Sequence, residues 1–334
     1  MTACLYLEFS RITLEGGIMT AWKTQCNALR AAGVKVVTNP SEPHDVLHVY
    51  LPLLRSRWLV QKYHWMGKPL VTHVHVTAED FKNSFRGSNL ITPLMRWWLT
   101  GYYRKGDVIL TPTEYTRHLV ADRYHLSKDK MIAISNGIDV AGFSPNKDLR
   151  EEYRKRYNMK GIVAFSLGWV FPRKGIFTFA DVARKFSDTQ FFWFGQSAPK
   201  AMTHAPRPIN PPENANFAGF IDSAKGAMNA GDIFFFPSYE ENQGIVVLEA
   251  AANGKAILLR DIPVYEGWMK HGENCFKAKT DEEFEKYLKI LLNDEKLRKQ
   301  FGEAARTMVK EHDLIHIGQK LKGIYESVLE KHSK

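Results

Sequence analysis

Short apolar segments of strand length alternate with longer amphipathic segments along the whole chain, and this alternation limits the fold more than any other feature. In the first half the apolar segments are residues 4–9, 34–38, 45–50, 69–74, 107–112 and 130–137. In the second half they are residues 162–168, 191–195, 216–220, 232–238 and 256–261. Strands that alternate with helices predict an α/β fold with parallel, doubly wound sheets.

The length of 334 residues suits two such domains. The polar segment 146–160 is the expected passage between them. We therefore expect a first domain at 1–150, a second at 151–310, and a C-terminal helix within 311–334 that crosses back to the first. Parallel α/β sheets bind ligands at the carboxyl ends of their strands, so the two sheets predict a ligand cleft.

Composition excludes several classes of protein. Hydrophobic residues make up 44% and charged residues 25%, which argues against a disordered or collagen-like chain. Three cysteines without CxxC spacing favour neither a disulfide framework nor a zinc site, and they predict a reducing, cytoplasmic location. The apolar runs are shorter than the roughly 18 residues of a membrane-spanning helix, and no signal peptide is expected.

Positive charge is concentrated in residues 50–105, where nine basic and two acidic residues give +7 of a total net charge of +10. The same stretch holds ten aromatic residues. A basic, aromatic surface is typical of a membrane interface or a nucleic-acid site, although an ordinary solvated face with buried tryptophans has the same composition. RNA-binding motifs of the RRM and KH kinds are absent, so no nucleic-acid partner is expected.

The segment 237–254, PSYEENQGIVVLEAAANG, predicts a buried strand that ends in a polar loop and then a helix. The N-terminus of a helix at this edge of a parallel sheet suits a diphosphate. Glu241 lies in the loop and Glu249 within the helix, where the two carboxylates could face a reacting group and sugar hydroxyls. A first-turn helix charge and a solvated glutamate would show the same spacing.

This segment, continued to residue 261, resembles the acidic signature of retaining glycosyltransferases of family 4, which have two Rossmann-like domains (the GT-B fold). Three other motifs agree in order and spacing: Glu15-Gly16-Gly17, SNGIDVAGFSP at 135–145, and LGWVFPRKG at 167–175. The segments 73–89, 111–119 and 260–268 are similar to bacterial enzymes that add a second hexose to monoglycosyl-diacylglycerol.

The resemblance implies roles for residues of the second domain. Lys174 would neutralise the leaving diphosphate, Glu241 would lie beside the transferred sugar, and Glu249 would hold the ribose. The family's usual arginine is replaced here by Trp169, so Arg173 is the expected second cation. The donor-binding set implied is Gly16, Gly17, Asn242, Gln243, Gly244, Ile245 and Glu249, although the glycine pair also fits a plain turn.

In the first domain, the resemblance implies that His75 reaches towards the sugar, although a lone histidine is often structural. Glu79 or Asp80 could orient the acceptor hydroxyl, and an N-cap role for one of them is the alternative. The expected membrane face comprises Arg86, Arg96, Trp97, Trp98, Arg104 and Lys105. It centres on a helix with apolar residues at 90, 94, 98 and 102, a stripe that would also suit the interior.

Together these features predict a retaining hexosyltransferase that moves glucose or galactose from a UDP-sugar onto a glycolipid such as monoglycosyl-diacylglycerol. It would be peripheral on the inner face of the plasma membrane. No cofactor is expected, and the lack of an Asp-x-Asp motif predicts independence of metal. The alternatives are an enzyme of the same family that acts on a soluble saccharide, and a non-catalytic membrane binder on the same fold. The intact Glu241, Glu249 and Lys174 argue against the binder.

Overall fold

A computed structural model describes residues 1–8, 16–81, 88–197 and 210–333. The chain forms two compact units. The first combines residues 1–138 with residues 312–333, in their described part, and the second is Asp139–Glu311. The return to the first unit at His312 places the C-terminal helix there, whereas the boundary expected at residue 150 lies inside the second unit.

The first unit is built on a six-stranded sheet in the order β2-β1-β3-β4-β5-β6. Every neighbouring pair in this sheet is parallel. Its strands are β1 (Thr2–Tyr6), β2 (Lys35–Val37), β3 (Val46–Val49), β4 (Leu70–His73), β5 (Val108–Thr111) and β6 (Met131–Ala133). The predicted parallel sheet is confirmed, with strand ends that differ from the prediction by one to a few residues.

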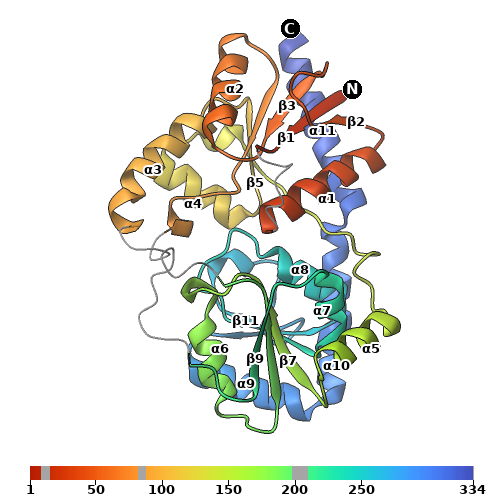
Figure 1. Cartoon of the computed structure of the whole chain (residues 1–334). Helices are drawn as coiled ribbons and strands as arrows, with labels where there is room; N and C mark the ends of the chain where they lie inside the picture. Colours follow the sequence, from red (N-terminus) through yellow and green to blue (C-terminus); the bar gives the residue numbers. More distant parts are fainter. Residues whose placement is uncertain (9–15, 82–87, 198–209, 334) are drawn as a thin grey trace. The chain divides into compact units, whose positions relative to one another are not determined.

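Helices cover both faces of this sheet. They are α1 (Gly17–Ala31), α2 (Leu54–Trp65), α3 (Ser88–Tyr103), α4 (Glu114–Tyr124) and α11 (Leu314–Ser333). Cys4 and Tyr6 of β1 pack in one core cluster with α2, α3 and α4, while Ala3 and Leu5 pack in another with α1 and α11. Figure 1 shows α11, in blue, beside the red α1, although their positions in the sequence are far apart.

The second unit repeats this arrangement with the strand order β12-β11-β10-β7-β8-β9, again all parallel. Its strands are β7 (Val163–Leu167), β8 (Gln190–Phe194), β9 (Ala215–Gly219), β10 (Ile233–Phe236), β11 (Ala256–Arg260) and β12 (Phe276–Ala278). The central strand β10 is apolar at every position and fully buried, as a strand covered on both faces must be. The edge strand β12 was not predicted from the sequence.

The helices of the second unit are α5 (Lys147–Arg156), α6 (Ile176–Ala183), α7 (Ala224–Ala230), α8 (Ile245–Ala252), α9 (Asp281–Asn293) and α10 (Glu295–Met308). Aromatic rings fill much of the core between this sheet and its helices. Phe179 of α6 contacts Trp193 of β8 and Phe235 of β10, with ring centroids 5.0 and 5.3 Å apart.

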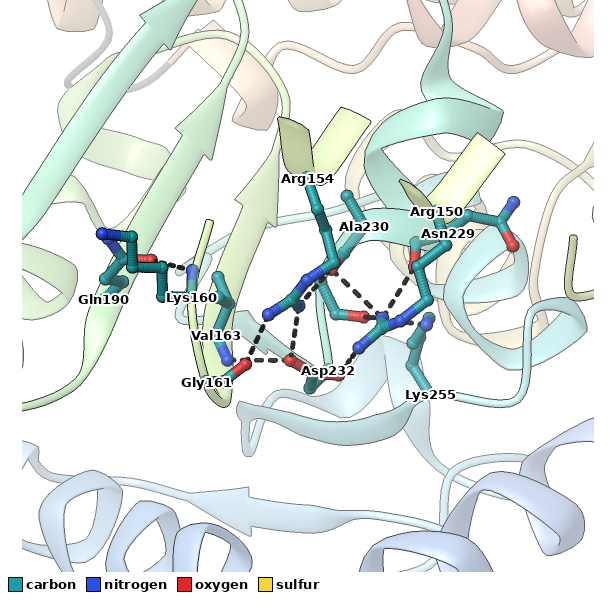
Figure 2. A network of polar contacts seen from close by, with 11 residues as sticks. Arg150, Arg154, Lys160, Gly161, Val163, Gln190, Asn229, Ala230, Asp232 and Lys255 are labelled. Carbon is teal, nitrogen blue, oxygen red and sulfur yellow. Dashed lines mark hydrogen bonds and ion pairs between the residues drawn. The ribbon is translucent and has the colours of Figure 1, made fainter. Parts of the chain in front are cut away.

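Helix α5 belongs to the second unit, although its polar sequence predicted a passage between domains. Arg150 and Arg154 of this helix both pair with Asp232, at 2.6 and 3.2 Å (Figure 2). Arg150 also donates to the carbonyl groups of residues 229–231. Asp232 in turn accepts a hydrogen bond from the backbone N–H of Val163. The charged side chains of α5 therefore attach this helix to the N-terminal ends of β7 and β10.

The first helix, α1, begins at Gly17, and Gly33 follows its end in the left-handed conformation with φ of 78°. Among the described helices of both units, none has the length and apolarity needed to cross a membrane.

Three histidines are buried in the first unit. His48 lies on β3, His73 ends β4, and His75 follows two residues later. Burial lowers the pKa of all three rings, for His75 to about 3. All three rings are therefore neutral at pH 7.

We expect the first unit to lose stability steeply below about pH 6. In the unfolded chain these histidines take up protons near pH 6.5, whereas the folded unit holds them neutral, so acid favours unfolding. With three such groups, the free energy of unfolding falls by up to ~4 kcal/mol for each pH unit below this range. Hydrogen exchange of the β3 and β4 amides between pH 7 and 4.5 measures it. His48→Gln should reduce the slope by about one proton, while the exposed control His118→Gln should not; a flat profile in the parent contradicts the prediction.

Candidate functional site

The turn after β7 and the loop after β10 meet in the second unit. Lys174 ends the 3-10 turn Pro172–Lys174, and its Nζ lies 2.5 Å from Oε1 of Glu241. Ser238 donates a hydrogen bond to the same oxygen at 2.7 Å. The side chains of Lys174 and Glu241 are only 16% and 10% exposed. Two residues predicted for one site thus form an ion pair largely shielded from water.

Glu241 is ionised at neutral pH. Burial by itself would raise the pKa of its carboxyl group, but the positive charges of Lys174 and Arg173 outweigh burial. Hydrogen bonds from Lys174 and Ser238 act in the same direction, so the pKa lies below its ordinary value. Glu241 therefore offers acceptors, and no proton, to a ligand.

Gly175 determines how closely the turn and the loop approach. Its φ of 81° lies in the left-handed region, and a Cβ at this position would lie 2.2 Å from the carbonyl oxygen of Pro237. Beside this contact, the N–H of Tyr239 donates to the carbonyl oxygen of Arg173 at 2.9 Å. Only glycine can both adopt this φ and leave room for the carbonyl oxygen of Pro237. Its packing role was not predicted, although the position after Pro-Arg-Lys in the motif could have indicated it.

Two arginines hold the loop in place. Arg173 donates to the carbonyl oxygen of Glu240 at 2.5 Å, and its Nε has no partner in the part of the chain that the structure describes. The expected second cation for a phosphate therefore also supports the loop. Arg260, which the sequence analysis missed, donates to the carbonyl oxygen of Pro237 at 3.0 Å and lies 3.8 Å from the ring centre of Tyr239. A charged residue at the end of an apolar strand was the available signal.

Helix α8 begins directly after this loop. Gly244 is its N-cap with φ of 78°, and Ile245 is its first residue. Gln243 is buried and Asn242 half-buried in the same loop, so four predicted donor residues lie together. The first N–H groups of a helix have no partner within it, and this end of the helix dipole is positive, so the geometry suits an anionic group.

Glu249 lies within α8 and is only 4% exposed. Burial raises the pKa of its carboxyl group to about 7, and the charge of Lys225 only partly opposes this shift. Its Oε2 has no hydrogen-bond partner among the described residues. A buried carboxylate oxygen without a partner is costly, which indicates that a ligand with donor groups completes this position.

Metal ligation has no obvious place in the described part of either unit, where no three His, Cys, Asp or Glu side chains gather closely enough to hold an ion. Independence of metal remains a prediction.

In the first unit, His75 is buried just beyond β4. Its ring stacks on His73 and Tyr50, with centroids 3.9 and 5.0 Å apart. Gly16 and Gly17 begin α1. Gly16 has an extended φ of 170°, and a Cβ on Gly17 would meet nothing within 4 Å. Steric crowding within the protein therefore does not explain Gly17, and Glu15 of the same motif lies outside the described residues.

Glu79 and Asp80, the tentative acceptor residues, are both engaged within the first unit. Asp80 accepts from the N–H of Thr77 at 2.9 Å, and the Thr77 hydroxyl accepts from the N–H of Asp80 at 3.2 Å. This reciprocal pair is a capping box in which Thr77 is the N-cap and Asp80 the residue that reaches back, so Asp80 has a capping role without being the N-cap itself. Glu79 accepts from Arg96 at 2.7 Å and from Tyr124 at 3.0 Å.

The residues expected on the membrane face divide into two groups. Arg96 pairs with Glu79, and Trp98 turns inward, where its Nε1 donates to the carbonyl oxygen of Pro52 at 2.8 Å. Lys105 donates to the carbonyl oxygen of Gly101. Of the described members of this set, Trp97 and Arg104 are exposed and the others are at least partly buried. Arg86 lies outside the described residues.

The predicted apolar stripe of α3 also divides, because 90 and 94 are exposed whereas 98 and 102 pack against the core. Apolar side chains are exposed on α2 as well, which lies within the basic, aromatic stretch 50–105 but outside the predicted helix. We call the exposed apolar side chains of the two helices the apolar face; it comprises Leu54, Trp58, Trp65, Leu90, Ile91, Leu94 and Trp97. The two helices are linked, since Arg57 of α2 donates to the carbonyl oxygen of Trp98 at 2.9 Å.

Solved structures share this architecture. HepE of Anabaena, solved in complex with UDP-glucose, superposes with a TM-score of 0.79 at 14% identity, covering 98% of this chain and 100% of the other. Sucrose-phosphate synthase of Thermosynechococcus elongatus gives a TM-score of 0.81 at 15% identity over 99% of each chain. At these identities the likeness concerns the fold alone.

Sequence comparison identifies the family. Residues 147–308 match Glycosyl transferases group 1, and residues 40–141 match Glycosyltransferase Family 4. The processive diacylglycerol alpha-glucosyltransferase of Acholeplasma laidlawii is 33% identical over 98% of this chain and 99% of its own length. An alpha-galactosylglucosyldiacylglycerol synthase of Streptococcus pneumoniae is 24% identical over 77% of this chain and 70% of its own. The chain therefore belongs to glycosyltransferase family 4, has the GT-B fold and is a hexosyltransferase.

Proposed function

We propose that this enzyme transfers glucose or galactose from a UDP-sugar to a membrane glycolipid such as monoglycosyl-diacylglycerol, with retention of the anomeric configuration. The observation that carries the proposal is the full-length likeness to a diacylglycerol glucosyltransferase. The exposed apolar face of α2 and α3 supports a lipid acceptor, because a soluble saccharide would not require one.

The donor would bind in the second unit. Its diphosphate would accept hydrogen bonds from the N-terminus of α8 at Gly244 and Ile245, and its ribose hydroxyls would donate to Glu249. The free Oε2 of Glu249 supports this assignment. Lys174 would neutralise the charge that develops as the sugar leaves. Because a lysine and a helix N-terminus supply the positive charge, we propose that no metal ion is needed.

Glu241 would lie beside the transferred sugar. Its ion pair with Lys174 keeps it ionised, so it can accept hydrogen bonds from sugar hydroxyls and hold the ring in place. In the first unit, His75 would contact the same sugar. Catalysis would then rest on positioning and on stabilising the leaving diphosphate, without a covalent intermediate on the enzyme.

The apolar face would bind the enzyme to the inner face of the plasma membrane. Trp58, Trp65 and Trp97 would enter the headgroup region, where the amphipathic indole ring is favoured. Arg104 would add attraction to anionic lipids. This arrangement relies on apolar side chains more than the sequence suggested, since Arg96 is used internally.

Product analysis tests the proposed reaction. We expect mass spectrometry to show a diglycosyl lipid after incubation with UDP-glucose or UDP-galactose and vesicles that contain monoglycosyl-diacylglycerol. EDTA should leave the yield unchanged, and NMR of the product should show an α-linkage from an α-donor. Transfer to free saccharides but not to the lipid would support the soluble-acceptor alternative instead, and no transfer from any UDP-sugar would refute the donor assignment.

Lys174→Ala should slow transfer about 100-fold, the scale on which one preorganised electrostatic group acts. The change also leaves Glu241 buried without its closest cation. Arg173→Ala should cost less, about tenfold, because one of its donors serves the loop backbone rather than a ligand. The exposed Lys185→Ala is the matched control. Steady-state rates check this order, and a fully active Lys174→Ala enzyme would remove the lysine from the mechanism.

Trp58→Ser, Leu94→Ser and Trp97→Ser combined should reduce vesicle binding at least tenfold, since each side chain withdraws apolar area from water on docking. The exposed pair Ile290→Ser and Ile315→Ser, outside α2 and α3, is the control. Co-sedimentation at low and high salt separates the hydrophobic from the electrostatic contribution to vesicle binding, because salt screens only the electrostatic one. Unchanged pelleting of the triple variant would refute the apolar face as the docking surface.

A further inference from the structure

A column of buried rings runs through one face of the first sheet. His48 on β3 and His73 on the neighbouring β4 have ring planes within 9° of parallel and centroids 5.3 Å apart. Nε2 of His48 lies 3.2 Å from Nδ1 of His73, within hydrogen-bond distance. At the other side of His48, Nδ1 lies 2.7 Å from the hydroxyl of Tyr325 on α11. Three side chains from three elements are therefore joined in series.

Counting donors and acceptors gives this series a direction. If Tyr325 donates to Nδ1 of His48, then Nε2 of His48 carries a proton and donates to Nδ1 of His73. This leaves one group, the Nε2–H of His73, without a partner in the described part of the chain. In the opposite direction, His73 would donate to His48 and His48 would donate to the hydroxyl of Tyr325. Two groups would then lack a partner, namely the hydroxyl hydrogen of Tyr325 and the Nε2 lone pair of His73. The first arrangement is favoured because unsatisfied buried polar groups are costly.

The column ends at His75. The ring of His73 stacks on that of His75 with centroids 3.9 Å apart, and Tyr50 stacks on His75 at 5.0 Å. Tyr50 is held in turn, because its hydroxyl donates to Gln25 of α1. The orientation of His75 thus depends on rings that are themselves fixed by hydrogen bonds.

The surroundings favour uncharged rings. The titratable groups nearest the column are Cys26 of α1, Tyr50 just after β3 and Tyr325 of α11, while Cys4 of β1 packs on the opposite face of the sheet. Burial raises the pKa of Cys26 to about 12 and that of both tyrosines as well, so all three are neutral at pH 7. A proton on the imidazole of His48 or His73 would therefore place an unpaired, buried positive charge near His75, which is costly.

We propose that Tyr325, His48 and His73 are positioning residues that hold the His75 ring neutral and in one orientation, so that helix α11 takes part in setting the geometry of the sugar site. The role of His75 rests on the proposed function; the column and its hydrogen-bond direction do not. A purely structural cluster would predict that the three residues affect folding stability alone.

The test uses the full-length enzyme labelled with ¹⁵N-histidine. In the parent, we expect ring nitrogen shifts that report His48 protonated at Nε2 and all three rings neutral at pH 7. Tyr325→Phe keeps the packed ring and removes only the hydroxyl. It should mix the tautomers of His48 and His73, move the His75 ring signals, and lower kcat about tenfold with little change in KM for the donor.

Further variants separate positioning from folding. His48→Gln places an uncharged amide donor beside His73 and should retain more activity than His48→Leu. Tyr287→Phe, a half-buried tyrosine of the second unit, and the exposed His118→Gln are the controls. Unchanged His75 signals in Tyr325→Phe would overturn the proposal, as would altered signals with parental kcat. If the parent transfers no hexose, the proposed function fails, while the His75 signals still decide whether the column positions that ring.

Discussion

The parallel pairing of β7 with β10 is the contact on which the donor side of the enzyme depends. Ala164 and Phe165 lie opposite Ile233 and Phe234, so both strands end at the same edge of the sheet. The turn after one and the loop after the other must then pass each other, and Gly175 allows them to touch. Lys174 and Glu241, distant in sequence, become an ion pair as a consequence of strand register rather than of local structure.

Much of this fold could be predicted from the sequence, because apolar runs of strand length that alternate with amphipathic helices are typical of a doubly wound parallel sheet. The residues proposed to bind the donor were implied by the family resemblance of one motif, which combines a strand end, a loop and a helix start. What the sequence could not supply were the partners of charged side chains. Arg96 looked like a surface cation until Glu79 was found beside it, and Arg150 looked like part of a linker until Asp232 was.

The apolar face is a second feature that the sequence could not predict. Helical periodicity predicted a single stripe on α3, but periodicity cannot tell which side of a helix meets the core. Trp98 packs inward and Trp97 does not, although they are adjacent in sequence. Residues of α2 belonged to the predicted aromatic stretch, but they follow no clear amphipathic pattern, so only the folded structure shows which of their side chains are exposed.

The return of the chain to the first unit has a consequence for synthesis. The second unit is continuous in sequence and can fold as soon as it has left the ribosome. One face of the first sheet is covered by α1 alone until α11 has been made, so Val46, Tyr50 and Leu110 lack the contacts of Leu321 and Tyr325 until then. The unit whose residues are translated first is therefore completed last, and until then its unfinished core is a surface that chaperones can recognise.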